Sequence, residues 1–148
     1  MSDTTIATDG LRSFFEGFAA SSTAGDADAL GRLYAPTILV AGPNGAHAVT
    51  PADLMRAIPQ RRQLLQSLGC QRTTLVGLEE TALDSRYTLA RAEWRWDFDP
   101  SNGAAAQLTL PSTFIVDRSA EPPRIVVYVM HQDLTAVLRD RGLLPHAT

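Results

Sequence analysis

The sequence predicts a small α+β domain: N-terminal helices wrapped by a curved, cone-shaped antiparallel sheet. Apolar residues recur with a helical period over much of residues 11–68 and with a period of two over residues 71–131. Because the strands are grouped after the helices, the pattern favours α+β over a parallel βαβ sheet. A twisted sheet that curls around a helix leaves an open end, where ligands commonly bind.

The first predicted helix, beginning near Leu11, has a strongly aromatic face. Phe14, Phe15 and Phe18 follow Leu11 at spacings of three, four and seven residues, which places all four on one side of a helix. Residues 1–9 are small and polar, and we expect a flexible N-terminus there. A face this aromatic requires a large apolar partner, and a sheet is the simplest one.

A short helix and a short strand are expected next. Asp26 is a suitable N-cap for the helix, and Pro36 ends it. Residues 37–41 are typical of a strand, and residues 42–45 (Gly-Pro-Asn-Gly) of a turn.

The third predicted helix has clear signals at both ends. Thr50 is a good N-cap, Pro51 suits the first helical position, and Asp53 favours the positive end of the helix dipole. Gly69 is a natural C-terminal stop. Pro59 lies inside, and we expect it to kink or split the helix.

Four strands are predicted after Gly69: residues 71–83, 86–98, 106–117 and 124–131. The second alternates most clearly, with an apolar face formed by Thr88, Ala90, Ala92, Trp94, Trp96 and Phe98. Gly77 predicts an irregularity in the first strand, and Pro111 a bulge or an unpaired N–H in the third.

The last predicted strand is apolar on both faces. Residues 124–131 read Arg-Ile-Val-Val-Tyr-Val-Met-His. We expect the helices to cover one face and a second copy of the chain to cover the other, which predicts a homodimer. Asp133 then has the position of an N-cap for a final helix over residues 134–141.

Composition narrows the classes of function. The length of 148 residues suits a single domain over 1–148, with the fold itself over 11–145. The net charge of −3 argues against nucleic acid, and the basic trio Arg56, Arg61 and Arg62 is interpreted as a solvated helix face. No apolar run approaches the ~20 residues that span a bilayer. A single cysteine and an N-terminus without a signal pattern favour the cytoplasm.

Two stretches resemble a known family. One runs from Phe14 to Tyr34 and contains Ala24-Gly25-Asp26-Ala27-Asp28-Ala29-Leu30; the other, Asp133 to Pro145, ends in Gly-Leu-Leu-Pro. Together with the order of elements, they resemble the nuclear transport factor 2-like fold. Its members include ketosteroid isomerase, scytalone dehydratase and the SnoaL-like polyketide cyclases.

The resemblance implies only part of the known chemistry. Ketosteroid isomerase uses a tyrosine, a general base and a second aspartate. The corresponding positions here are Phe18, the region of Gly42, and Ser112, so the resemblance implies that all three catalytic groups are missing. The SnoaL-like acid/base aspartate matches Asp133, while the histidine position falls at Ser112 or Thr113.

Three residues are candidates for proton chemistry. Asp133 is either a general base or only the helix cap, and a cap role would make it a weaker base. His131 lies two residues earlier, a spacing that in a strand places both on one face, although a half-buried or dimer-contact histidine is the simpler interpretation. Tyr128 would polarise a carbonyl, or bond a neighbouring backbone group.

A second set of residues is expected to line an apolar pocket, or to belong to an ordinary core: Phe14, Phe18, Tyr34, Trp94, Trp96, Ser112, Phe114 and Met130. The three histidines lack metal-ligand spacing, and no cofactor or metal is expected. The sequence therefore predicts a protein that binds a small apolar or aromatic molecule. It leaves open turnover by a cofactor-free isomerase, cyclase or dehydratase; the alternative is a non-catalytic dimerisation or protein–protein adaptor module.

Overall fold

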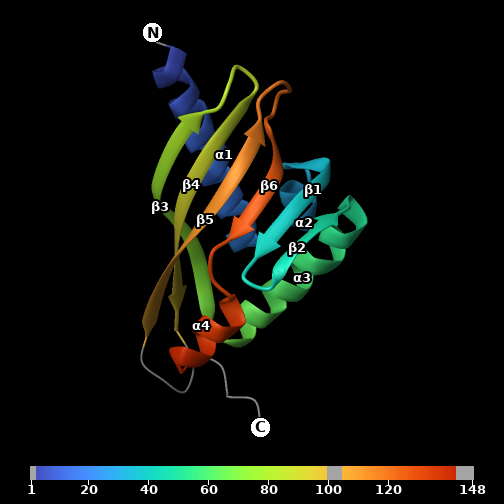
Figure 1. Ribbon diagram of the computed structural model, residues 1–148. Coiled ribbons are helices and arrows are strands. Elements are labelled where there is room, and N and C mark those ends of the chain that lie inside the picture. Colours follow the sequence, from blue (N-terminus) through green and yellow to red (C-terminus); the bar gives the residue numbers. More distant parts are fainter. Residues whose placement is uncertain (1–2, 100–104, 143–148) are drawn as a thin grey trace.

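The computed structural model describes residues 3–99 and 105–142, and in this part of the chain a curved, unclosed sheet and N-terminal helices form an α+β fold (Figure 1). The elements are, in order, α1 (Asp3–Ala24), α2 (Ala27–Gly31), β1 (Tyr34–Gly42), β2 (Gly45–Val49), α3 (Pro51–Ser67), β3 (Cys70–Ala82), β4 (Tyr87–Phe98), β5 (Ala106–Asp117), β6 (Arg124–Met130) and α4 (Leu134–Asp140).

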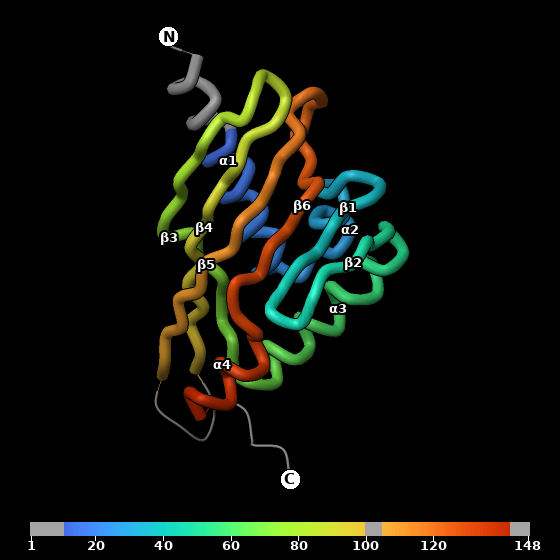
Figure 2. The backbone as a smooth tube through the Cα atoms, viewed as in Figure 1, coloured from blue at the N-terminus to red at the C-terminus, as the bar shows by residue number. Residues whose placement is uncertain are grey.

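The six strands form one sheet in the order β2-β1-β6-β5-β4-β3. Neighbouring strands are antiparallel except for β1 and β6, which run parallel with Leu39 opposite Val127. These two strands lie side by side although they are far apart in the sequence (Figure 2). The expected sheet was wholly antiparallel. The parallel pair is not visible in hydrophobic periodicity, because periodicity carries no information about strand direction.

The β1–β2 hairpin is longer than the sequence predicts. Only residues 37–41 were expected as a strand, but β1 extends from Tyr34 to Gly42 and pairs with β2 across the turn, where Gly42 faces Gly45. Apart from Val49, the residues of β2 are exposed. Since β2 has no buried face over most of its length, its sequence shows no alternation that would reveal it.

Three helices, α2, α3 and α4, begin at the predicted cap residues. Asp26 accepts a hydrogen bond from the Ala29 N–H at 3.0 Å, and Thr50 and Asp53 form a reciprocal capping box. Three helices differ from the prediction. α2 ends at Gly31, and Pro36, which was expected to end it, lies in β1. α1 begins at Asp3 rather than near Leu11, and α3 continues through Pro59 without a break. Pro59 is exposed, so the carbonyl that loses its partner is on the solvent side of the helix.

The long strands follow the predicted pattern. The even-numbered residues of β4 from Thr88 to Phe98 are all buried, which confirms the apolar face. The register shifts between Leu75 and Gly77, as Gly77 predicts. Pro111 pairs with Glu93 without a shift, and pairing with β6 begins only at Ser112. Of the two predicted alternatives, the structure shows no bulge at Pro111, and β6 ends before it reaches this residue.

The core lies between α1 and the concave face of the sheet. Phe15 is fully buried, with its ring centroid 4.9 Å from that of Phe114 on β5 and 6.3 Å from that of Trp94 on β4. A second cluster around Phe98 and Leu138 fills the other end, where α4 and the end of α3 meet the sheet. None of the described helices is long and apolar enough to span a membrane.

Replacing the central aromatic ring should therefore be costly. We expect Phe15→Ala to lower the free energy of unfolding by about 3–5 kcal/mol, because it leaves a cavity between α1 and the sheet. Urea denaturation followed by circular dichroism measures this. Leu83→Ala is the control: Leu83 is 52% exposed, and its loss should change stability by less than about 0.5 kcal/mol. Equal effects of the two substitutions would contradict this view of the core.

Candidate functional site

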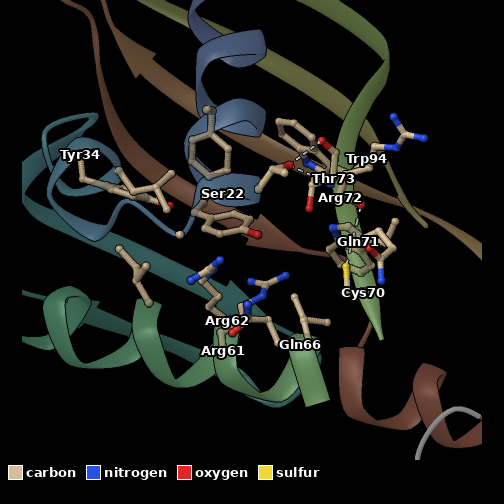
Figure 3. Close-up of a pocket in the computed structure, with 18 residues that line it drawn as sticks. Ser22, Tyr34, Arg61, Arg62, Gln66, Cys70, Gln71, Arg72, Thr73 and Trp94 are labelled. Atoms are coloured by element: carbon tan, nitrogen blue, oxygen red, sulfur yellow. Dashed lines mark hydrogen bonds between the residues drawn. The ribbon is translucent and has the colours of Figure 1, made fainter. Parts of the chain in front are cut away.

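A cavity of about 390 Å³ lies between α1, α3 and the concave face of the sheet (Figure 3). Its walls come from elements distant in the sequence: the C-terminal half of α1, the start of β1, the middle of α3, and strands β3, β4 and β6. The curvature of the sheet separates α3 from β4 at this end, so helix side chains do not fill all of the enclosed space.

One wall of the cavity is aromatic. It is formed by Phe18, Tyr34, Trp94, Trp96 and Tyr128. The Phe18 ring centroid is 5.4 Å from that of Trp94 and 6.2 Å from that of Tyr34. The Tyr128 ring stacks on Phe114 of the core at 4.8 Å, which fixes its orientation. These rings form an apolar surface inside the cavity.

The opposite wall is cationic. Arg61 and Arg62 point from α3 into the cavity, and Arg72 of β3 lines its edge (Figure 3). The Arg61 guanidinium lies 5.5 Å from the centroid of the Trp96 ring, and the nearby Tyr128 hydroxyl favours its positive charge. Arg72 forms an ion pair with Asp97 at 3.2 Å.

Arg62 has its position because of a glycine. Gly25 has a φ of +70° and ends α1, and the Arg62 side chain occupies the space where a Cβ at residue 25 would be. Any other residue at this position would be strained and would displace Arg62. The loop between α1 and α2 thus holds an arginine at the edge of the cavity.

The environment sets the charge state of these groups. Burial raises the pKa of Tyr34 far above the ordinary tyrosine value, and Tyr128 acts in the same direction against the opposing effect of Arg61. Burial opposes the charge on Arg61, but the hydroxyl oxygens of Tyr128 and Tyr34 favour it and leave the pKa of Arg61 above its usual value. At neutral pH the cavity therefore holds a protonated Tyr34 beside a charged Arg61.

A second hollow, of about 620 Å³, lies between the β1–β2 hairpin, α3 and the start of α4. It is lined by His47, Met130 and Asp133 among others, and Arg61 contributes to both spaces. In the part of the chain that the structure describes, no group of three or more His, Cys, Asp or Glu residues is arranged to hold a metal ion.

The eight residues expected to line a pocket divide into three groups. Phe18, Tyr34, Trp94 and Trp96 line the cavity. Phe14, Ser112 and Phe114 are buried, with exposed fractions of 8%, 6% and 0%, and are not among its lining residues. Met130 lines the second hollow. The residues of the first group come from α1, β1 and β4, which the fold brings together around one space.

The three candidate proton-transfer residues are not brought together. Only Tyr128 lines the cavity. His131 is exposed, and its Nε2 atom lies 2.6 Å from the hydroxyl oxygen of Thr113. Asp133 accepts a hydrogen bond from the Thr135 N–H at 3.0 Å and caps α4. The expectation that His131 and Asp133 share a strand face is wrong because β6 ends at Met130, before either residue. Their catalytic roles stay predictions.

The sequence analysis missed the cationic wall. Arg56 is exposed, as expected of a solvated face, but Arg61 and Arg62 are half-buried and face the cavity. The signal was present in the helical spacing. Arg61 follows Ile58 by three residues and Leu65 follows Arg61 by four, so Arg61 lies within the apolar stripe of α3. A charged residue inside an apolar stripe indicates a buried or functional role.

Comparisons with known proteins agree on the fold. A family model described as NTF2-like protein (DUF6841) matches residues 8–133. No curated protein matches the chain. Among solved structures, an NTF2-like protein with a cystatin-like fold from Novosphingobium aromaticivorans has 18% identity and a TM-score of 0.70, covering 94% of this chain and 89% of that one. An NTF2-like protein of unknown function from Shewanella oneidensis has 16% identity and a TM-score of 0.66, covering 85% and 99%.

A third similar structure is the β subunit of benzoate 1,2-dioxygenase from Burkholderia mallei. It has 14% identity and a TM-score of 0.64, covering 83% of this chain and 88% of that chain. At these identities the three structures establish a shared fold.

The cap geometry of Asp133 leads to a test with two substitutions. Asp133→Ala should lower the free energy of unfolding by about 1 kcal/mol, because the first N–H groups of α4 lose their acceptor. Asp133→Asn should have a much smaller effect, since an asparagine side chain also caps well. Thermal and urea unfolding measure both, with Asp140→Ala at the other end of α4 as the control. A loss with Asp133→Asn as large as with Asp133→Ala would contradict a cap role.

Proposed function

Because the chain belongs to the NTF2-like family described as DUF6841, we propose that it binds a small, mainly apolar or aromatic molecule in the cavity between α1, α3 and the sheet. The observation that supports this most directly is the wall of five aromatic side chains around a space of about 390 Å³. Ligand sites of proteins are typically concave, largely apolar and of roughly 300–1,000 Å³, with a few polar groups that fix orientation.

Binding is favoured over catalysis by the polar groups of the cavity. Among the described residues, no aspartate, glutamate or histidine lines it. A cofactor-free isomerase, cyclase or dehydratase needs a group that accepts a proton within hydrogen-bond reach of the substrate. In this cavity Tyr128 would polarise a carbonyl, while Asp133 and His131 would have to act from outside it. We therefore propose a binding protein rather than an enzyme.

We also propose that two copies of the chain associate through the outer face of the sheet. Charged and polar residues cover much of this face on β4 and β5, but one part of it is aliphatic: Leu89, Ile115, Val127 and Val129, with Leu39 beside them at 43% exposed. An apolar sheet face of this kind is costly to leave in water, and a second copy presents the same surface.

Ligand binding can be tested with the neutral fluorescent probe N-phenyl-1-naphthylamine. We expect saturable binding with a rise in probe fluorescence, and at least a tenfold loss of affinity in Ser22→Phe, because Ser22 lines the cavity and a phenyl ring there would occupy part of it. Ser13→Phe is the matched control, since Ser13 is an exposed residue of the same helix. Absence of binding, or equal binding by the two variants, would count against the cavity as the site.

The dimer can be tested by light scattering coupled to size exclusion. We expect a mass twice the 16.0 kDa of the chain at micromolar concentration. Val129→Arg should shift the protein to the monomer, because it places a charge within the apolar face. Leu83→Arg, at an exposed turn between β3 and β4, is the control and should stay dimeric. A monomeric wild-type protein would refute the proposal.

A further inference from the structure

The charge inside the cavity is opposite to the charge of the protein. The chain has 13 basic and 16 acidic residues, a net charge of −3. The described residues that line the cavity include three arginines and no aspartate or glutamate. Arg72 is paired with Asp97, which also pairs with Arg95. Two arginines on α3 therefore face an aromatic cavity without an acidic residue in its wall.

Arg61 is the arginine whose neighbours in the cavity are best defined. Its guanidinium lies 5.5 Å from the centroid of the Trp96 ring and near the Tyr128 hydroxyl, and neither neighbour is a carboxylate. Among the described residues, the ion pairs of the chain involve Arg12, Arg56, Arg72, Arg86 and Arg95, but neither Arg61 nor Arg62. Partly buried charges are normally paired with an opposite charge, because removing them from water is costly.

Arg62 lines the same cavity as Arg61. The two residues are adjacent on α3, and both side chains point from the helix into the cavity (Figure 3). Gly25 leaves the room that Arg62 needs. Holding two cations on one wall is unfavourable without an anion between or beside them. Packing of the apolar stripe of α3 does not explain why a charged residue, Arg61, lies within that stripe.

We infer that the ligand of this cavity is an anion: an aromatic or largely apolar molecule with a carboxylate or similar oxyanion, whose charged end binds Arg61 and whose ring packs against Trp94 and Phe18. This inference rests on the proposed binding function and adds the chemical class of the ligand. The planar guanidinium of Arg61 suits two parallel hydrogen bonds to an oxyanion. Arg62 supplies a second cation, and the Tyr34 and Tyr128 hydroxyls supply further donors.

The arrangement also explains why a neutral ligand is a poorer fit. A neutral ring would bury the aromatic wall but would remove water from Arg61 without replacing the hydrogen bonds that water makes. An oxyanion replaces them with charge-assisted bonds. The aromatic wall and the cationic wall are therefore complementary to the two ends of one amphiphilic molecule.

The test compares two fluorescent probes that differ by one anionic group. 8-Anilinonaphthalene-1-sulfonate has the same rings as N-phenyl-1-naphthylamine and adds a sulfonate. We expect the wild-type protein to bind the sulfonate probe at least tenfold more tightly. In Arg61→Met, where Arg62 is still present, this preference should fall markedly while binding of the neutral probe is retained. Arg56→Met removes an exposed charge from the same helix and should leave the preference unchanged.

A second ligand pair extends the test to carboxylates and does not require a variant to fold. 2-Naphthoate and its neutral amide, 2-naphthamide, compete with the bound sulfonate probe on the wild-type protein, and the carboxylate should compete at least tenfold better. Arg61→Lys keeps the charge but loses the planar donor pair, and we expect an intermediate preference. Circular dichroism establishes that each variant used is folded.

The outcomes separate the two proposals. If neither fluorescent probe binds, the binding function and the inference both fail. If the neutral probe binds as tightly as the sulfonate, or if the amide competes as well as the carboxylate, the cavity binds ligands but the anion inference is wrong. If the preference for the sulfonate is unchanged in Arg61→Met, Arg61 does not bind the anionic group and its assignment is overturned.

Discussion

The packing of the aromatic face of α1 on the concave side of the sheet is the interaction on which the rest of the structure depends. Phe15 contacts Phe114 and Trp94, and Phe18 contacts Trp94 and Tyr34, so one helix connects β1, β4 and β5. Large rings cannot be enclosed by a flat sheet, and the long strands β3 to β5 curve around the helix. The same curvature creates the cavity at the end of α1, where the rings no longer fill the space.

The cavity is completed by α3, which brings a different chemistry. α1 and β4 contribute rings, whereas α3 contributes Arg61 and Arg62 next to Ile58 and Leu65. Helix capping at Thr50 sets where α3 begins and therefore which residues of its inner face reach the cavity. The close approach at Gly25 connects the end of α1 to α3 through Arg62. Backbone geometry at two helix ends thus positions the polar groups of the site.

Charge is distributed in a way that suits selective binding. Exposed ion pairs such as Arg86 with Asp117 balance charge on the surface, and the acidic excess of the chain is outside the cavity. The charge in the cavity wall is positive and is held beside uncharged rings and hydroxyl groups. Electrostatic interactions are stronger in such a partly enclosed site than in water, so a small number of groups can discriminate between an anion and its neutral analogue.

The sequence by itself determined the α+β class, the long strands and the helix caps, because each depends on local spacing. The alternation from Thr88 to Phe98 and the cap residues Asp26 and Asp133 are readable without any long-range contact. It also identified four of the aromatic residues that line the cavity, since they belong to the apolar faces of predicted elements. Its interpretation of Arg61 as a solvated residue was wrong, although the stripe of α3 contained the signal.

Only the tertiary structure decided which of these residues share a site. The parallel pairing of β1 with β6 brings Tyr34 and Tyr128 to the same wall, and no local pattern encodes that pairing. It also separated His131 and Asp133 from the cavity, because β6 ends at Met130 and the chain turns away before either residue. Strand direction, strand length and helix approach depend on contacts between segments far apart in the chain, which residue spacing alone does not record.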